Sequence, residues 1–287
     1  MIMAAAWTST LLVLCATWSA GLLVTGAVLS LRGEDRPAAV PSTALAGALA
    51  LVALAVAVTG MPHPERVFHL LANPASAITQ QLYAAVLAVV VAVVALVARS
   101  RSSDGALPAW ASAAALVSGV LLVVTAARRH MLPSEPLTDG APWALWVIGA
   151  ACVLGPATLA LLRAARGRAS LEWAVPALVA CAVAGGATSL VYGLWAHGLG
   201  VASTTSGLGM DFTNPTAARG VASSLLAPGE ARCLLACSVV ALAVPLACAL
   251  VGLVPAARVS RGARTALAGA ALAAELVCAL GVLHAVL

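Results

Sequence analysis

Long apolar runs alternate with shorter polar segments along the whole chain. Eight of these runs have about the length that a helix needs to cross the roughly 30 Å hydrocarbon core of a membrane. They cover residues 7–31, 42–60, 83–98, 109–127, 143–162, 173–195, 233–254 and 265–287. The runs are continuous and rich in Ala, Leu and Val, without the alternation of membrane-spanning strands. The pattern predicts an all-α fold, a polytopic integral membrane bundle of eight transmembrane helices that forms a single domain over residues 1–287.

The composition excludes a soluble globular protein. Hydrophobic residues make up 62% of the chain, charged residues make up only 9%, and the mean hydropathy is +1.05. Soluble domains carry about 25% charged residues. We therefore expect a multi-pass protein of the plasma (inner) membrane, surrounded by membrane lipid. The net charge of +5 follows from the topology described next and does not indicate nucleic-acid binding.

All fifteen basic residues are arginines, and they are distributed unevenly over the predicted loops. The first, third, fifth and seventh loops hold ten of them: Arg32, Arg36, Arg99, Arg101, Arg163, Arg166, Arg168, Arg258, Arg261 and Arg264. The longer second, fourth and sixth loops hold five: Arg66, Arg128, Arg129, Arg219 and Arg232. Because cytoplasmic loops are enriched in basic residues, both termini are predicted to lie on the outer face. Residues 1–6 carry no positive charge and are not expected to form a signal peptide.

Aromatic and sulfur-containing residues add little specific chemistry. Six of the seven tryptophans lie at the ends of predicted spans, as expected for an aromatic belt at the membrane interface: Trp7, Trp110, Trp143, Trp146, Trp173 and Trp195. The seven cysteines lie in or beside apolar runs without a Cys-x-x-Cys pair, and among the histidines only His284 lies close to a span. We therefore expect no haem, iron–sulfur cluster, molybdenum or other metal to be bound by this chain.

The polar segment over residues 61–82 holds more chemistry than any other part of the chain. It contains His63, Glu65, Arg66, His69 and Gln81 between two apolar runs. Under the predicted topology this segment faces outward, and all five histidines of the chain lie on that same face. Histidines and carboxylates can exchange protons near neutral pH. The segment is therefore our candidate functional loop, although loop residues are polar by default and most of those around it are expected to be merely solvated.

Glu275 is the one carboxylate near the middle of a predicted span. Placing a charged residue there costs on the order of 2.5 to 3.5 kcal/mol on the lenient insertion scale, so such a residue is a functional candidate by default. Two interpretations stay open at this point. Glu275 takes part in moving protons, or it is a neutral carboxylic acid that is hydrogen-bonded to a neighbouring helix.

The candidate loop resembles the second loop of the DMSO reductase anchor subunit family. The resemblance rests on Pro64-Glu-Arg66, Asn73-Pro74, Ser76 and Ile78-Thr-Gln-Gln-Leu82. The stretch Pro64-Glu-Arg-Val-Phe-His-Leu-Leu71 is also similar to the related membrane subunits of polysulfide and nitrite reductases. The length, the eight predicted spans and the outward termini agree with the anchor family, and Glu275 stands where that family has a carboxylate.

The resemblance implies a subunit of an anaerobic respiratory enzyme. Such a chain anchors a molybdopterin catalytic subunit and an iron–sulfur subunit at the outer face, and passes electrons from menaquinol to them. By this resemblance, His63 and His69 would accept protons and Gln81 would donate a hydrogen bond to a quinone oxygen. Arg66, beside Glu65, would supply a field or docking charge. The metals would belong to the partner subunits.

The chain also departs from the family pattern, and these departures keep other functions open. The His-Leu-Gly that opens the family motif falls on Gly60 and Pro62, its closing acidic residue falls on Gln81, and the Gly-Arg after the last-span carboxylate falls on Cys278-Ala279. An anchor that does not bind quinol is therefore one alternative. A small-solute transporter or permease is another, favoured only by Glu275 and by prolines within spans.

Overall fold

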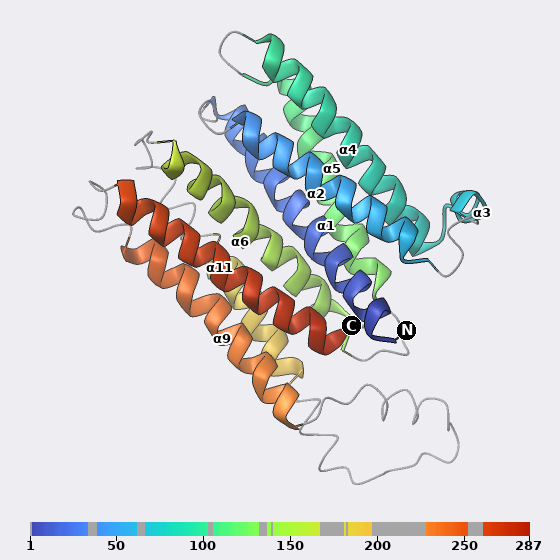
Figure 1. Ribbon diagram of the computed structural model, residues 1–287, viewed down its shortest axis with the longest axis vertical. Coiled ribbons are helices and arrows are strands. Elements are labelled where there is room, and N and C mark those ends of the chain that lie inside the picture. Colours follow the sequence, from blue (N-terminus) through green and yellow to red (C-terminus); the bar gives the residue numbers. More distant parts are fainter. Residues whose placement is uncertain are drawn as a thin grey trace.

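The computed structural model describes residues 2–33, 39–61, 67–102, 106–131, 137–138, 140–166, 181, 183–196, 228–251 and 261–287. Figure 1 shows an elongated bundle of helices that run side by side along one direction. Every regular element in the described ranges is helical. The prediction of an all-α fold is thus confirmed for this part of the chain.

The helices alternate in direction through the bundle. They are α1 (Ile2–Leu31), α2 (Ala39–Thr59), α3 (Val67–Leu71), α4 (Ala77–Arg101), α5 (Ala109–Arg129), α6 (Ala141–Ala165), α9 (Pro228–Val251) and α11 (Arg261–Val286). Residues 183–196 are helical as well. Six helices, α1, α2, α4, α5, α6 and α11, are long and apolar enough to cross a membrane, which makes the chain a multi-pass membrane protein. They correspond to six of the eight predicted spans.

The two remaining predicted spans lie partly outside the described residues. The sixth was predicted over 173–195, and the structure describes its second half as the helix over 183–196. The seventh corresponds to α9, which has 24 residues. The side chains of Arg232–Cys248 in α9 are described, and this segment is apolar but shorter than the six helices named above. A total of eight spans stays a prediction.

Helix α1 lies at the centre of the bundle and packs against α2, α5 and α6. Helix α4 packs against α2 and α5 on one side of the molecule, whereas α11 packs against α6 and α9 on the other (Figure 1). Small side chains make these approaches possible. The buried face of α2 consists of Ala39, Ser42, Thr43, Ala46, Ala50, Ala53 and Ala57. Such a face lets membrane helices approach closely, because no bulky side chain separates the backbones.

The third predicted span begins earlier than the apolar pattern suggested. The prediction was 83–98, but α4 begins at Ala77 and extends to Arg101. Ser76, in an extended conformation, directly precedes the helix, after the turn that contains Asn73 and Pro74. Polar residues at the start of α4 concealed the helix from a hydropathy pattern, although they fit its periodicity. As a consequence, Gln81 lies within a helix and not in the loop to which we assigned it.

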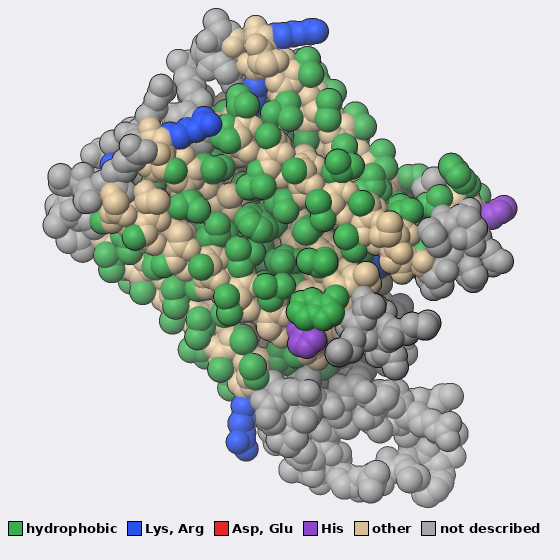
Figure 2. Space-filling view, viewed as in Figure 1, with side chains coloured by type: hydrophobic (Ala, Val, Ile, Leu, Met, Phe, Trp, Pro, Cys, Tyr) green, Lys and Arg blue, Asp and Glu red, His purple; other side chains and the backbone are tan. Residues whose placement is uncertain are grey.

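Both termini lie at one end of the bundle, which we call the terminal end (Figure 1). There the ring of Trp7 on α1 stacks on the ring of His284 on α11, with the centroids 5.0 Å apart. The other end, which we call the opposite end, carries most of the described arginines: Arg32, Arg99, Arg101, Arg163, Arg166 and Arg264. Figure 2 shows one face of the molecule with hydrophobic side chains over its middle and arginines toward its ends.

Candidate functional site at the terminal end

The described loop candidates, His69 and Gln81, lie toward the terminal end, and the structure describes three of the six predicted site residues. His63, Glu65 and Arg66 lie outside the described residues. His69 is exposed on α3, a helix of five residues that stands apart from the main bundle in Figure 1. Gln81, in contrast, is only 1% exposed. In the polar segment, His69 is therefore exposed to the surroundings, whereas Gln81 is buried in the bundle.

Two arginines at the end of α5 each donate a hydrogen bond to a glutamine at the start of α4. Arg128 Nη1 donates to Gln80 Oε1 over 2.7 Å at an exposed position. Arg129 Nη1 donates to Gln81 Oε1 over 3.1 Å at a partly buried one. The two pairs are parallel, since each joins residues 48 positions apart. They hold the start of α4 and the end of α5 together at the terminal end.

His130 directly follows this pair and is buried at the end of α5. Its side chain is 9% exposed, and its Nε2 atom finds no hydrogen-bond partner among the described residues. Burial, and to a smaller extent the positive charge of Arg129, lowers the pKa of His130 to about 4. Both effects disfavour the charged imidazolium. His130 is therefore a neutral imidazole at physiological pH.

An aromatic cluster packs behind His130. The ring of Trp143 meets the His130 ring edge to face at 6.2 Å and stacks on Trp146 at 5.3 Å. Tyr192 contacts both tryptophans, and Trp195 lies 5.8 Å from Tyr192. Two polar atoms of the cluster donate to backbone carbonyls: Trp143 Nε1 donates to Ala127 O, and Tyr192 Oη donates to Leu137 O.

This cluster corrects the prediction of an aromatic belt for two residues. Trp143 and Trp146 are 0% and 3% exposed, so they pack inside the protein and do not face lipid headgroups. Trp7 and Trp110, at 47% and 64%, are exposed as a belt requires. The position of a residue at the end of a span indicates its depth in the membrane but not the direction in which its side chain points.

Glu275 is buried in α11, away from the Gln81 and His130 positions. Its side chain is 2% exposed, and its Oε2 atom has no hydrogen-bond partner within the described part of the chain. It precedes His284 by nine residues, which corresponds to roughly 14 Å along a helix. Helices α11 and α4 belong to different sides of the bundle, since α11 packs against α6 and α9. The structure therefore does not bring Glu275 and Gln81 into one site.

Two buried nitrogen atoms are the groups at the terminal end that could form hydrogen bonds to a ligand. Gln81 Nε2 and His130 Nε2 both lack a partner in the described structure, and Arg129 connects their positions by its bond to Gln81 and by its place in the chain. Gln81 Nε2 is an amide donor, and the neutral imidazole of His130, beside the ring of Trp143, can accept a hydrogen bond. Sequence reasoning had placed His130 with the other histidines on the outer face, and Arg129 among outer-face charges of which most were expected to be solvated. The available signal was that Arg128 and Arg129 follow one predicted span on the same side of the membrane on which Gln80 and Gln81 precede another.

No protein-family model matches this chain, and no curated protein matches its sequence.

Acidification should destabilise the protein through His130. The folded pKa of about 4 lies below the usual value of 6.5, so the unfolded chain binds more protons between these values, and stability falls as the pH falls. From pH 7.5 to 5 the expected loss is about 2 kcal/mol. Thermal unfolding in detergent across this range should show it, and His130→Gln should flatten the pH dependence. An unchanged slope in that variant would assign the effect to other groups.

Replacing Glu275 with leucine should stabilise the bundle. A buried acceptor without a partner costs about 1 to 3 kcal/mol, and Glu275 Oε2 is such an acceptor among the described residues. We expect Glu275→Leu to raise the midpoint of thermal unfolding and Glu275→Gln, which keeps a polar group, to leave it nearly unchanged. A lower midpoint for the leucine variant would show that Glu275 is hydrogen-bonded to a neighbour, the second of the two interpretations given above.

Proposed function

We propose that this chain is the membrane anchor subunit of a DMSO reductase-like molybdopterin oxidoreductase. In this proposal it holds an iron–sulfur subunit and a molybdopterin catalytic subunit at its terminal end, and it passes electrons from menaquinol to them in anaerobic respiration. The observation that supports the proposal most directly is the motif from Pro64 to Leu82, whose last residues form the start of α4 beside the buried polar groups.

The distribution of arginines supports an outward-facing terminal end. Among the described side chains, three arginines lie at this end, Arg128, Arg129 and Arg232, and six lie at the opposite end. By the positive-inside rule the opposite end is cytoplasmic. The terminal end would then face the compartment in which the partner subunits dock, and the exposed His69 on α3 would lie on the docking face.

The buried polar groups fit the requirements of quinol oxidation. Menaquinol loses two electrons and two protons when it becomes menaquinone. The electrons would pass to a cluster of the iron–sulfur partner, and the protons would leave through basic groups near the surface. Gln81 Nε2 can donate to a quinone oxygen, and the neutral imidazole of His130 can accept a hydrogen bond from a quinol hydroxyl. His63 and His69 stay candidates for the proton acceptors in the loop.

Purification of the tagged chain from anaerobically grown cells tests the proposal. The chain should be extracted in a mild detergent and analysed for molybdenum, iron and two larger polar subunits. Both metals and both subunits are expected. A chain that purifies alone and without metals would contradict the proposal and favour a transporter.

A second step separates a working anchor from one that only tethers its partners. The complex should oxidise a reduced menaquinol analogue, and a double His63→Ala and His69→Ala variant should assemble normally but lose most of this activity. Tyr83→Phe, at an exposed position on α4, serves as a control for general damage near the loop. Normal quinol oxidation by the double variant would remove both histidines from the mechanism, and no oxidation by the unmodified complex would assign the chain a purely tethering role.

A further inference from the structure

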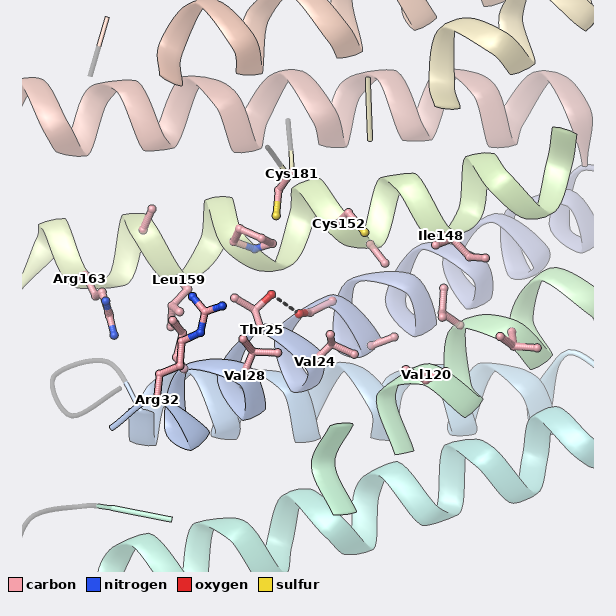
Figure 3. A pocket seen from close by; sticks show the side chains of 18 residues that line it. Val24, Thr25, Val28, Arg32, Val120, Ile148, Cys152, Leu159, Arg163 and Cys181 are labelled. Carbon is pink, nitrogen blue, oxygen red and sulfur yellow. Dashed lines mark hydrogen bonds between the residues drawn. The ribbon is translucent and has the colours of Figure 1, made fainter. Parts of the chain in front are cut away.

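A cavity of about 440 Å³ lies between α1, α5 and α6 and reaches the opposite end of the bundle at Arg32 and Arg163. Its volume is within the roughly 300 to 1,000 Å³ of typical ligand sites. Figure 3 shows its lining: Val24, Thr25 and Val28 of α1, Val120 of α5 and Ile148 of α6 face the same space. The walls are almost entirely apolar, and the lining residues that the structure describes include no acidic one.

The cavity has a cationic end. Arg32 at the end of α1 and Arg163 on α6 both line it (Figure 3), and their guanidinium groups extend into the space between the two helices. Arg32 is exposed, whereas Arg163 is only 5% exposed. Two guanidinium groups at the mouth of an apolar cavity match an anion that is attached to an apolar chain, because planar guanidinium groups bind phosphate oxygens well.

The cavity is long enough for an acyl chain that crosses one leaflet of a membrane. Its lining runs from Ala20 to Arg32 on α1 and from Ile148 to Arg163 on α6, which corresponds to roughly 18 and 22 Å along a helix. One leaflet contributes about 15 Å of hydrocarbon, half of the total thickness. A lipid with its headgroup at Arg32 and Arg163 would therefore place an acyl chain along most of the cavity.

Polar groups inside the cavity are too few to hold a quinone ring at its closed end. The Thr25 hydroxyl lines the cavity but donates its hydrogen bond to Gly21 O over 2.7 Å (Figure 3). Cys152 and Cys181 are weak hydrogen-bonding groups. Water molecules would find few hydrogen-bond partners on these walls, and an apolar cavity of this kind stays dry. An acyl chain, in contrast, restores the dispersion contacts that an empty cavity forfeits.

We propose that this cavity binds one anionic phospholipid of the membrane leaflet at the opposite end of the bundle, with its phosphate between Arg32 and Arg163 and an acyl chain between α1, α5 and α6. Basic pockets between transmembrane helices are known binding places for acidic lipid headgroups on the cytoplasmic side. This proposal is independent of the partner subunits and of quinol oxidation.

Lipid retention by the purified full chain, in its complex if one forms, tests the proposal. Native mass spectrometry in detergent should show one phosphatidylglycerol retained in preference to phosphatidylcholine. Arg32→Gln, at an exposed position, should weaken this retention at least tenfold without unfolding the protein. Val28→Phe, which fills the cavity, should abolish retention of both lipids. Inorganic phosphate should neither bind nor compete, which distinguishes a lipid from a free anion.

A matched control is available at the same end of the bundle. Arg101 is an exposed arginine near the end of α4 and does not line the cavity, so Arg101→Gln should retain the lipid like the unmodified protein. The proposal is overturned if Arg101→Gln loses as much lipid as Arg32→Gln, since the attraction would then be general. Equal retention of both lipids, or displacement of the lipid by menaquinol, would overturn it as well.

Discussion

Replacing Gly21 with leucine is expected to prevent α1 from packing against α6 and to leave little folded protein. A β-carbon at Gly21 would meet the backbone oxygen of Ala151 at less than contact distance and would lie 3.0 Å from the backbone nitrogen of Gly155. Backbone atoms of a packed helix cannot move aside as a flexible side chain can. Overpacking costs about 1 to 3 kcal/mol and more where backbones must separate, which is a large share of a typical stability of about 5 to 15 kcal/mol.

Gly26, five residues later on the same helix, provides the matched control. A β-carbon there meets nothing within 4 Å, so Gly26→Leu should be tolerated better than Gly21→Leu. We would compare the yield of monodisperse protein on size-exclusion chromatography and the midpoint of thermal unfolding in detergent. A Gly21→Leu variant as stable as Gly26→Leu would show that α1 and α6 do not approach as closely as the structure indicates.

The general fold was predictable because a membrane imposes one simple requirement on the chain. Each segment that crosses the hydrocarbon must be apolar over about 20 residues, and this property is visible without any tertiary contact. The pattern accordingly located six helices that can span a membrane, and an even number of predicted spans implied that both termini lie at one end. The contact between Trp7 and His284 confirms that implication.

The candidate site was harder to predict because it depends on how the helices rotate about their axes. Gln81 was recognised as a polar residue near a functional loop, but its burial follows from the face of α4 that packs on α5. The same rotation selects Arg129 as its partner and leaves Arg128 exposed. Hydropathy gives the depth of a residue in the membrane and not its partner. For this reason Trp143 was expected among the lipids and lies in the protein interior.

Replacing Arg129 with methionine should strongly impair the proposed quinol oxidation, although Arg129 itself does not contact the quinol. The substitution keeps a long side chain but removes the hydrogen bond to Gln81 Oε1, so the buried amide loses the contact that orients it. Hydrogen bonds to charged groups contribute about 1.5 to 3 kcal/mol. We therefore expect a comparable loss of stability and, through the misplaced Gln81 amide, a 10- to 100-fold lower rate, equivalent to about 1.4 to 2.8 kcal/mol.

Three further variants separate this specific effect from a general loss of positive charge. Arg128→Met removes the same charge one residue earlier and breaks an exposed hydrogen bond to Gln80, for which the expected effect is small because water replaces the lost contact. Arg129→Lys restores a donor without the planar guanidinium geometry and should recover part of the rate. Gln81→Met combined with Arg129→Met should be no worse than Gln81→Met alone, since Arg129 acts through the Gln81 amide. Equal damage from Arg128→Met, or additive losses in the double variant, would show that Arg129 acts through charge alone and that the Gln81 amide does not contact the quinol.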